Sequence, residues 1–444
     1  MGSEMCIRDR YTKVKRNDHR WRNQLKSAHI KFYNEFGNHK NANKVLLKAA
    51  KHQFEDKEYT ESYSSSSILV NKKNIDRKTY ASAILIHAHS AFELEKYMLA
   101  EGAYNDAIKV ADNKLKPSLK EKAAASAYLF AKSQINSNPK LAVSELSRVG
   151  TTYKGTSVAN TASFDAAGLL MKQNDNSRAE AILVKLKGSQ AAKGKGYDEK
   201  NLHEKLAYIY LNNKQYNKAA NEFVYIYNRE KNVAKKREIL LSIADLYKKA
   251  GNRSQALKMQ KEYVKVYKSP LSDYVNTLDE IATYYKDNRN LKLERTYLIE
   301  IVDISKKYKQ LPSEVKHYIA KANLRFAYFE YQVFARAKLH RPLKKTLKNK
   351  IKLMKKVLKK YDDVINIGDF ELTSEATYNI ANTYYVLSKD ILGSQRPKGL
   401  SDDEYEQYTI ILEDQAYPFE DKSIEIHKKN LSLTQKGGMN KWVT

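Results

Sequence analysis

The sequence contains few of the residues that interrupt helices. It has 15 Gly and 7 Pro in 444 residues, whereas average usage of these two residues together is roughly 12%. Strand-rich folds need turn residues every few positions and would use more of both. A hydrophobic fraction of 42% is large enough to form a core. The composition therefore predicts a folded protein built from long helices.

Cysteine and long apolar runs are also scarce. A single Cys excludes an intramolecular disulfide and a cysteine-based zinc site. No apolar stretch approaches the ~18 residues that cross a bilayer, and no signal-peptide pattern is present. The Cys lies in Met1–Arg10, which resembles a translated sequencing-adapter remnant. We therefore treat residues 1–10 as non-native and expect the natural N-terminus, with any signal sequence, upstream of Tyr11.

Acidic residues are few relative to basic ones. The chain has 80 Lys and Arg against 51 Asp and Glu, a net charge of +29. This charge admits nucleic acid, an anionic membrane surface or an acidic protein as a partner. The lysines are spread along the whole chain together with 33 Tyr, which favours ordinary solvated helical surfaces over a dedicated polyanion-binding function.

A repeat marked by small residues runs through the chain. In its clearest unit, Tyr210 follows Ala207 by three residues, and Ala219 and Phe223 follow by twelve and sixteen. Two facing helices explain this spacing, because small residues let the backbones approach while aromatic rings fill the groove beside them. The small anchor residues are Ala50, Ala88, Ala127, Ala167, Ala207, Ala244 and Ala282, separated by 38, 39, 40, 40, 37 and 38 residues. We expect the Ala127 unit to be weaker, because Pro139 falls where its second helix should begin.

These units resemble the tetratricopeptide repeat (TPR) family over residues 43–305. The resemblance implies an all-α fold, a right-handed α-solenoid of antiparallel helix pairs forming a TPR-like superhelix. The period exceeds the family's ~34 residues and the early Trp is absent, so we expect an irregular superhelix. Residues 11–42 are expected to form an N-terminal helical segment and 306–444 irregular helical repeats, in which Ala322 or Ala327 and then Ala381 are possible anchors.

Two charge blocks stand out near the C-terminal end. Residues 341–366 predict one long basic helix with ten Lys and Arg between Arg341 and Lys360, and residues 401–421 hold eight acids without Lys or Arg. The helix carries an apolar stripe of Leu343, Leu347, Ile351, Met354, Leu358, Tyr361 and Ile365. Its candidate binding residues are Lys348, Lys352, Lys355, Lys356 and Lys359. Three interpretations stay open: a solvated face, pairing with the acidic block, or docking of an acidic protein or lipid.

The sequence shows no pattern typical of catalysis or metal binding. The ten His lack metal-ligand spacing, and we expect His87 in the core and His89 on the surface. The segment Gly188–Gly196 superficially resembles a phosphate loop, but Gly196 stands where the Mg²⁺-binding Ser or Thr is required. We therefore predict no enzyme activity, no metal and no cofactor.

The TPR resemblance also implies a concave binding surface. In that arrangement the residues one and four positions after each anchor face the groove. The candidates are His89, Phe92, Tyr128, Met171, Tyr208, Leu211, Asp245, Lys248, Thr283 and Lys286. The peptide-carboxylate clamp of some TPR domains needs Lys and Asn where this chain has Glu204 and Tyr208, so a chaperone-tail binder is not supported.

The end of the chain carries a second resemblance. Residues Leu412–Lys422, followed by Glu425–His427 and Trp442, look like the end of large TPR proteins of Gram-negative envelopes, found beside TolQR and ExbBD-type motors and in gliding machinery. This implies a protein-binding scaffold in the periplasm or at the outer membrane, with envelope-complex components as partners. The alternative is a cytoplasmic nucleic-acid-associated repeat protein, which the charge and the many Tyr admit. RNA-reading repeats present the same side chains in each unit, whereas His, Tyr, Gly, Tyr, Asp and Thr follow one another here, which favours the scaffold.

Overall fold

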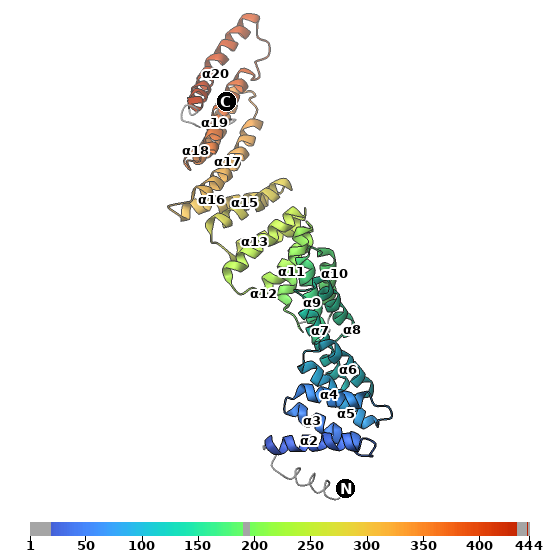
Figure 1. Cartoon of the computed structure of the whole chain (residues 1–444). Coiled ribbons are helices and arrows are strands. Elements are labelled where there is room, and N and C mark those ends of the chain that lie inside the picture. Colours follow the sequence, from blue (N-terminus) through green and yellow to red (C-terminus); the bar gives the residue numbers. More distant parts are fainter. Residues whose placement is uncertain (1–18, 190–195, 433–441, 443–444) are drawn as a thin grey trace. The chain divides into compact units, whose positions relative to one another are not determined.

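The computed structural model describes residues 19–189, 196–432 and 442, and these residues form helices without any β-strand (Figure 1). This confirms the all-α prediction. Met1–Arg10 and most of the loop Gly188–Gly196 lie outside the described residues. The chain divides into two compact units, Met1–Ile226 and Tyr227–Thr444.

The helices follow one another as short antiparallel pairs and then as longer ones. The first are α2 (His19–Glu35), α3 (Ala42–Glu55), α4 (Tyr59–Val70), α5 (Arg77–Glu93), α6 (Tyr97–Val110), α7 (Lys116–Ser133), α8 (Pro139–Thr152), α9 (Ser157–Lys172), α10 (Asn176–Lys187), α11 (Glu199–Asn212) and α12 (Tyr216–Arg229). They continue with α13 (Val233–Lys249), α14 (Arg253–Val266), α15 (Leu271–Asp287), α16 (Leu291–Lys307), α17 (Ser313–Arg336), α18 (Leu343–Ile365), α19 (Phe370–Leu392) and α20 (Asp402–Leu431).

The predicted anchors occupy equivalent positions in this series. Each of the seven lies on the first helix of a pair, on α3, α5, α7, α9, α11, α13 and α15, and each is buried. Consecutive helices pack against each other, as α5 does on α6 and α13 on α14. Because an alanine at the contact lets two backbones approach closely, the anchors fix where each pair crosses. The α-solenoid of antiparallel helix pairs is therefore confirmed.

A left-handed residue ends the first helix in six of the seven units, always seven positions after the anchor. These residues are Lys57, Glu95, Asn174, Lys214, Gly251 and Arg289, with φ between 55° and 75°. In the Ala207 unit the N–H of Lys214 donates to the Leu211 carbonyl at 3.0 Å, and the N–H of Gln215 donates to the Tyr210 carbonyl at 2.8 Å. This pair of bonds is the Schellman motif, which satisfies the last carbonyls of a helix. The second helix then begins nine residues after the anchor.

The Ala127 unit departs from this pattern in a way the sequence analysis misjudged. Its second helix, α8, does begin at Pro139, and the Asn138 side chain accepts a hydrogen bond from the Leu141 N–H at 3.1 Å. Proline is well tolerated at the first helical position because the N–H it lacks would have no partner there. Pro139 therefore starts α8, and the unit differs by a longer turn, with the buried small residue supplied by Ala142.

The Ala282 unit replaces the second small residue with a charged one. Glu294, twelve positions after the anchor, is 1% exposed and accepts hydrogen bonds from Arg325 of α17 at 2.6 and 3.3 Å. The Arg325 guanidinium also lies 4.6 Å from the centre of the Phe329 ring. A buried carboxylate needs such a partner to offset its lost hydration. The ion pair therefore ties α16 to the long helix that follows.

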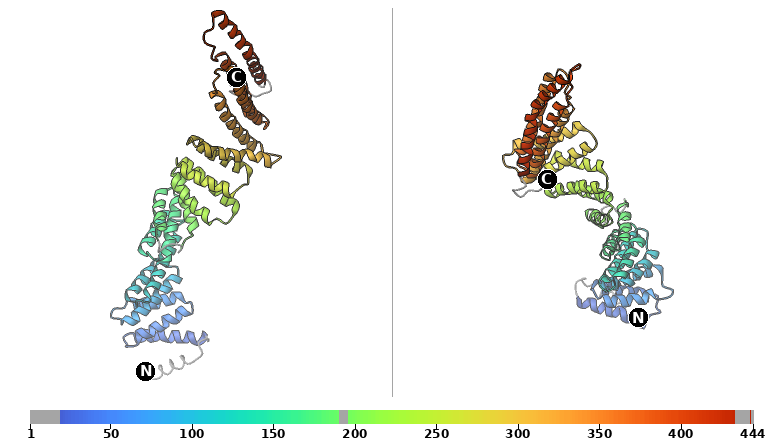
Figure 2. Two further views of the ribbon diagram at one scale, coloured as in Figure 1. Left: turned by 180° about the vertical axis from the view of Figure 1, so that it is seen from behind. Right: turned by 90° about the horizontal axis from the view of Figure 1, so that it is seen from above.

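The last four helices are longer than those before them and lie side by side (Figure 2). They have 24, 23, 23 and 30 residues, against 12 to 18 in α3–α16. Ala322 and Ala327 are buried on α17 and Ala381 on α19, so the extra residues between these positions lengthen helices instead of adding a separate element. On α18, Met354 and Tyr361 of the predicted stripe are buried. The other five stripe residues are half-buried, and the stripe analysis missed the buried Lys350, Val357 and Val364.

Candidate binding groove between α18 and α20

The first residues of the predicted concave surface take part in packing between helices. Half-buried His89 lies 2.6 Å through Nδ1 from the Tyr104 hydroxyl, and burial lowers the pKa of His89 to about 4. The Tyr128 hydroxyl donates to Asp165 at 2.7 Å, and the Phe92 ring lies 5.8 Å from that of Tyr97. His87, expected in the core, is also half-buried and stacks on Tyr63 at 4.2 Å.

The later residues of that surface are more open. Met171 and Leu211 are half-buried, Tyr208 is 54% exposed, and Thr283 and Lys286 are exposed. Lys248 pairs with Glu280 at 2.6 Å and approaches Asp245 to 3.9 Å, while Lys249 pairs with Asp245 at 2.8 Å. Among the described contacts, Asp245 with Lys248 is the one ion pair between members of the predicted set. A binding surface shared by these ten residues stays a prediction.

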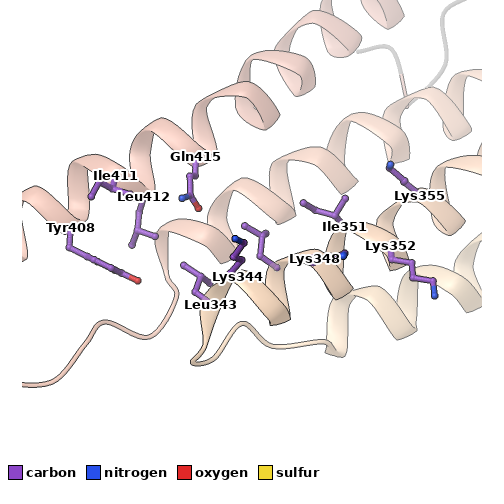
Figure 3. Close-up of a pocket in the computed structure, with 11 residues that line it drawn as sticks. Leu343, Lys344, Lys348, Ile351, Lys352, Lys355, Tyr408, Ile411, Leu412 and Gln415 are labelled. Carbon is purple, nitrogen blue, oxygen red and sulfur yellow. The ribbon is translucent and has the colours of Figure 1, made fainter.

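A groove between α18 and α20 collects the basic and apolar features of the C-terminal region (Figure 3). Its volume is ≈ 850 Å³. It is lined by Leu343, Lys344, Leu347, Lys348, Ile351, Lys352, Lys355, Tyr408, Ile411, Leu412 and Gln415. Both helices pack on α19, which holds them apart.

The α18 side of the groove consists of two parallel rows. Leu343, Leu347 and Ile351 recur every four residues and form an apolar row along the helix. A row of lysines lies beside it: Lys344, Lys348, Lys352 and Lys355. The α20 side contributes no charge, and its Ile411 is 51% exposed. The groove is therefore an apolar channel with a basic edge.

The lysines on this edge have no acidic partner in the described part of the chain. All four are exposed, no carboxylate lines the groove, and none of the four forms an ion pair with a described residue. Two other lysines of α18 do form ion pairs, Lys350 with Asp390 and Lys360 with Asp363. The edge thus carries an uncompensated positive charge beside apolar side chains.

One open interpretation was that the basic block pairs with residues 401–421. No such ion pair occurs among the described residues. The eight acids of that block are exposed and form no ion pair with α18. The α20 residues that line the groove beside α18 are Tyr408, Ile411, Leu412 and Gln415, and none of them is acidic (Figure 3). Of the five predicted basic residues, Lys348, Lys352 and Lys355 line the groove, while Lys356 and Lys359 are exposed outside it.

The α20 wall and Lys344 were missed by the sequence analysis. A signal was present, since Tyr408, Ile411, Leu412 and Gln415 recur at helical spacing within an otherwise acidic segment. The eight acids of residues 401–421 led to the prediction of an acidic block, without an apolar side. The apolar line on α20 would have indicated that this helix has a second, uncharged face.

The described residues also bear on metal sites and membrane spans. The described residues contain no group of three or more His, Cys, Asp or Glu side chains placed to hold a metal ion. Across the same residues, no helix combines the length and apolar character needed to span a membrane.

Comparisons with known proteins give matches among solved structures. No protein-family model matches the chain, and no curated protein matches it significantly. A tetratricopeptide repeat protein from Parabacteroides merdae ATCC 43184 is 11% identical over 63% of this chain and 98% of its own, at a TM-score of 0.27. BtubC (BKLC) from P. vanneervenii is 14% identical over 49% of this chain and 90% of its own, at 0.24. The apo form of RapI is 11% identical over 87% of this chain and 98% of its own, at a TM-score of 0.25. Because these TM-scores are low, the evidence for the helical-repeat fold is the helix pairs and buried anchors described above.

Proposed function

We propose that this protein is a non-catalytic scaffold that binds another protein in the groove between α18 and α20. The observation that carries the proposal is the row of unpaired lysines beside an open apolar channel. A helix lying in this channel would bury its apolar side chains between Leu347 and Ile411, and its carboxylates would meet the lysines. Helix-in-groove recognition uses this combination of apolar anchors and flanking charge.

We further propose that the scaffold works in the periplasm or at the outer membrane, as part of an envelope complex. The support is the resemblance of Leu412–Lys422 and the residues after it to the ends of envelope TPR proteins. This segment lies on α20 and includes the groove residues Leu412 and Gln415. The compartment is tested by fractionating cells that carry the intact gene; recovery in the cytoplasm alone would contradict this part of the proposal.

The nucleic-acid alternative gains little from the groove. Single-stranded nucleic acid is usually held by several aromatic rings on which bases stack, together with a basic track. The groove offers one ring, Tyr408, among aliphatic side chains. The lysine row alone supplies the electrostatic part of such a site without the stacking part.

The binding proposal is tested by crosslinking from inside the groove. A photoreactive residue placed at Ile411 in the full chain, expressed in its native host, should form a protein adduct whose yield falls in Lys348→Glu/Lys352→Glu/Lys355→Glu. The matched control is Lys356→Glu/Lys359→Glu, which alters exposed lysines of the same helix outside the groove. Adducts with RNA alone would support the nucleic-acid alternative and contradict the scaffold.

A further inference from the structure

The side of α20 that faces away from the groove carries an exposed apolar line. Ile410, Tyr417 and Ile424 are 51%, 66% and 46% exposed. They are seven residues apart, almost two full helical turns, so their side chains form one line along the helix. None of these three residues lines the groove.

Acidic side chains flank this line. Glu406, Glu413, Asp414, Glu420 and Asp421 are all exposed and lie within about one turn of it. Among the described residues none of the five forms an ion pair with a basic side chain. The outer side of α20 is thus an acidic, apolar helical surface, which we call the acidic face.

The acidic face and the groove lie on opposite sides of one helix. Ile410 follows the groove residue Tyr408 by two positions, and Tyr417 follows Gln415 by two, which is about 200° around an α-helix. The two surfaces therefore cannot meet within one chain. Their unpaired charges have opposite signs. The acidic residues flank an exposed apolar line, and the lysines border the half-buried row of Leu343, Leu347 and Ile351.

The two charged rows are comparable in length. At 1.5 Å of rise per residue, the line from Ile410 to Ile424 is about 21 Å long, the lysine row from Lys344 to Lys355 is about 17 Å long, and the apolar row from Leu343 to Ile351 is about 12 Å long. Lysines border that row from Lys344 to Lys355, and acids border the Ile410–Ile424 line throughout. A helix with the character of the acidic face is the kind of ligand that the groove is shaped and charged to accept.

We infer that the groove binds the acidic face of α20 from a second copy of this chain. The inference rests on the proposed function, since it names the protein that occupies the groove. Because the two surfaces differ and lie on opposite sides of α20, the contact is heterologous, so each bound copy still offers one free groove or one free face. Association then continues from copy to copy instead of stopping at a symmetric dimer.

Two sets of substitutions separate the two surfaces. The groove variant is Lys348→Glu/Lys352→Glu/Lys355→Glu, and the face variant is Glu413→Lys/Asp414→Lys/Glu420→Lys. Sedimentation velocity of the full wild-type chain at low salt should show species larger than a dimer that grow with concentration. Each variant alone should associate at least about tenfold more weakly, because like charges would then face each other. The control Lys356→Glu/Lys359→Glu should behave as wild type.

Mixing gives the decisive result. The groove variant keeps an intact face and the face variant keeps an intact groove, and the reversed groove of the one is complementary in charge to the reversed face of the other. An equimolar mixture should therefore associate beyond a dimer with the two variants alternating, although neither variant associates well alone. A chain carrying both sets should associate again, because both charge rows are reversed together. Far-ultraviolet circular dichroism of every variant checks that the helices remain.

Several outcomes would overturn the inference. These are a wild-type chain that stays monomeric at its highest soluble concentration, a mixture of the two variants that associates no better than either variant alone, or a groove variant that associates as wild type does. A monomeric wild type that still crosslinks from Ile411 to another protein would leave the proposed function standing. Wild-type chain that is monomeric but floats with phosphatidylglycerol vesicles, when the groove variant does not, would assign the groove to lipid and remove both proposals.

Discussion

The short repeats of α3–α16 and the long helices of α17–α20 use their faces differently. In the repeats, rings and hydroxyls of successive helices contact each other, as His89 does Tyr104 and Tyr128 does Asp165. In the long helices, α18 and α20 both pack on α19 and leave an apolar groove between them. The comparison teaches that short paired helices bring polar and aromatic side chains of neighbouring helices into contact, whereas two long helices packed on a third leave an apolar groove between them.

The largest effect is expected from removing the ion pair between Glu294 and Arg325, which joins the last short helix to the first long one. Glu294→Ala would leave the partly buried Arg325 guanidinium without its carboxylate, and we expect a loss of about 3–5 kcal/mol in the free energy of unfolding. Urea denaturation followed by circular dichroism measures it. Lys422→Ala, at the exposed pair with Glu425, is the matched control and should leave the transition unchanged. A Glu294→Ala chain as stable as wild type would show that the pair contributes nothing.

Acid should weaken the repeats through His89. Burial lowers its pKa to about 4, whereas in the unfolded chain the pKa is about 6.5, so on acidification the unfolded state takes up the proton first. The contribution of His89 is complete above about pH 6.5 and is lost as the pH falls towards 4, by up to roughly 3 kcal/mol. Burial also lowers the pKa of His52 and His87, so those residues act in the same direction.

The His89 contribution is isolated by difference. The free energy of unfolding is measured between pH 7.5 and pH 4 for wild type and for His89→Gln. The slope with pH should be smaller in the variant, and equal slopes would contradict the prediction.

Overpacking an anchor tests how closely the paired helices approach. Ala207 is buried where two helices cross, and Ala207→Leu should destabilise the fold by roughly 1–3 kcal/mol. Tyr208→Ala, one residue on and 54% exposed, is expected to shift the thermal midpoint far less. Equal shifts for the two changes would mean that the anchor has no special packing role.

The smallest effect on stability is expected from the exposed lysines of α18. Changing Lys352, Lys355, Lys356 and Lys359 together to Gln removes exposed charges, each worth only ~0–1 kcal/mol and unpaired in the described structure. Stability should barely change, whereas self-association should weaken and lose its salt dependence. A large loss of stability would indicate that these lysines hold the fold together.

The fold could be predicted from the sequence because its determinants are periodic. Small residues spaced 37 to 40 apart indicate helix crossings wherever they occur, and the structure buries all seven. The left-handed conformation could not be predicted at Lys57, Glu95, Lys214 and Arg289, because these residue types rarely adopt it, whereas Gly251 and Asn174 are types that do. Only the α18 side of the groove could be predicted, because its lysine row lies on one helix. The opposite wall depends on where α20 packs, which the spacing of residues does not give.

The constant spacing from anchor to turn has a consequence for where the chain tolerates added residues. In six units the first helix ends, the left-handed residue occurs and the second helix starts at fixed distances from the anchor, so the variable period arises after the second helix begins. One residue inserted between Ala207 and Lys214 would rotate every following side chain of that helix by about 100° and misplace the turn. A tag or protease site between Asp112 and Asn113, in the exposed link from α6 to α7, would leave both helices intact. The links between pairs are therefore the natural places to cut, label or extend this chain.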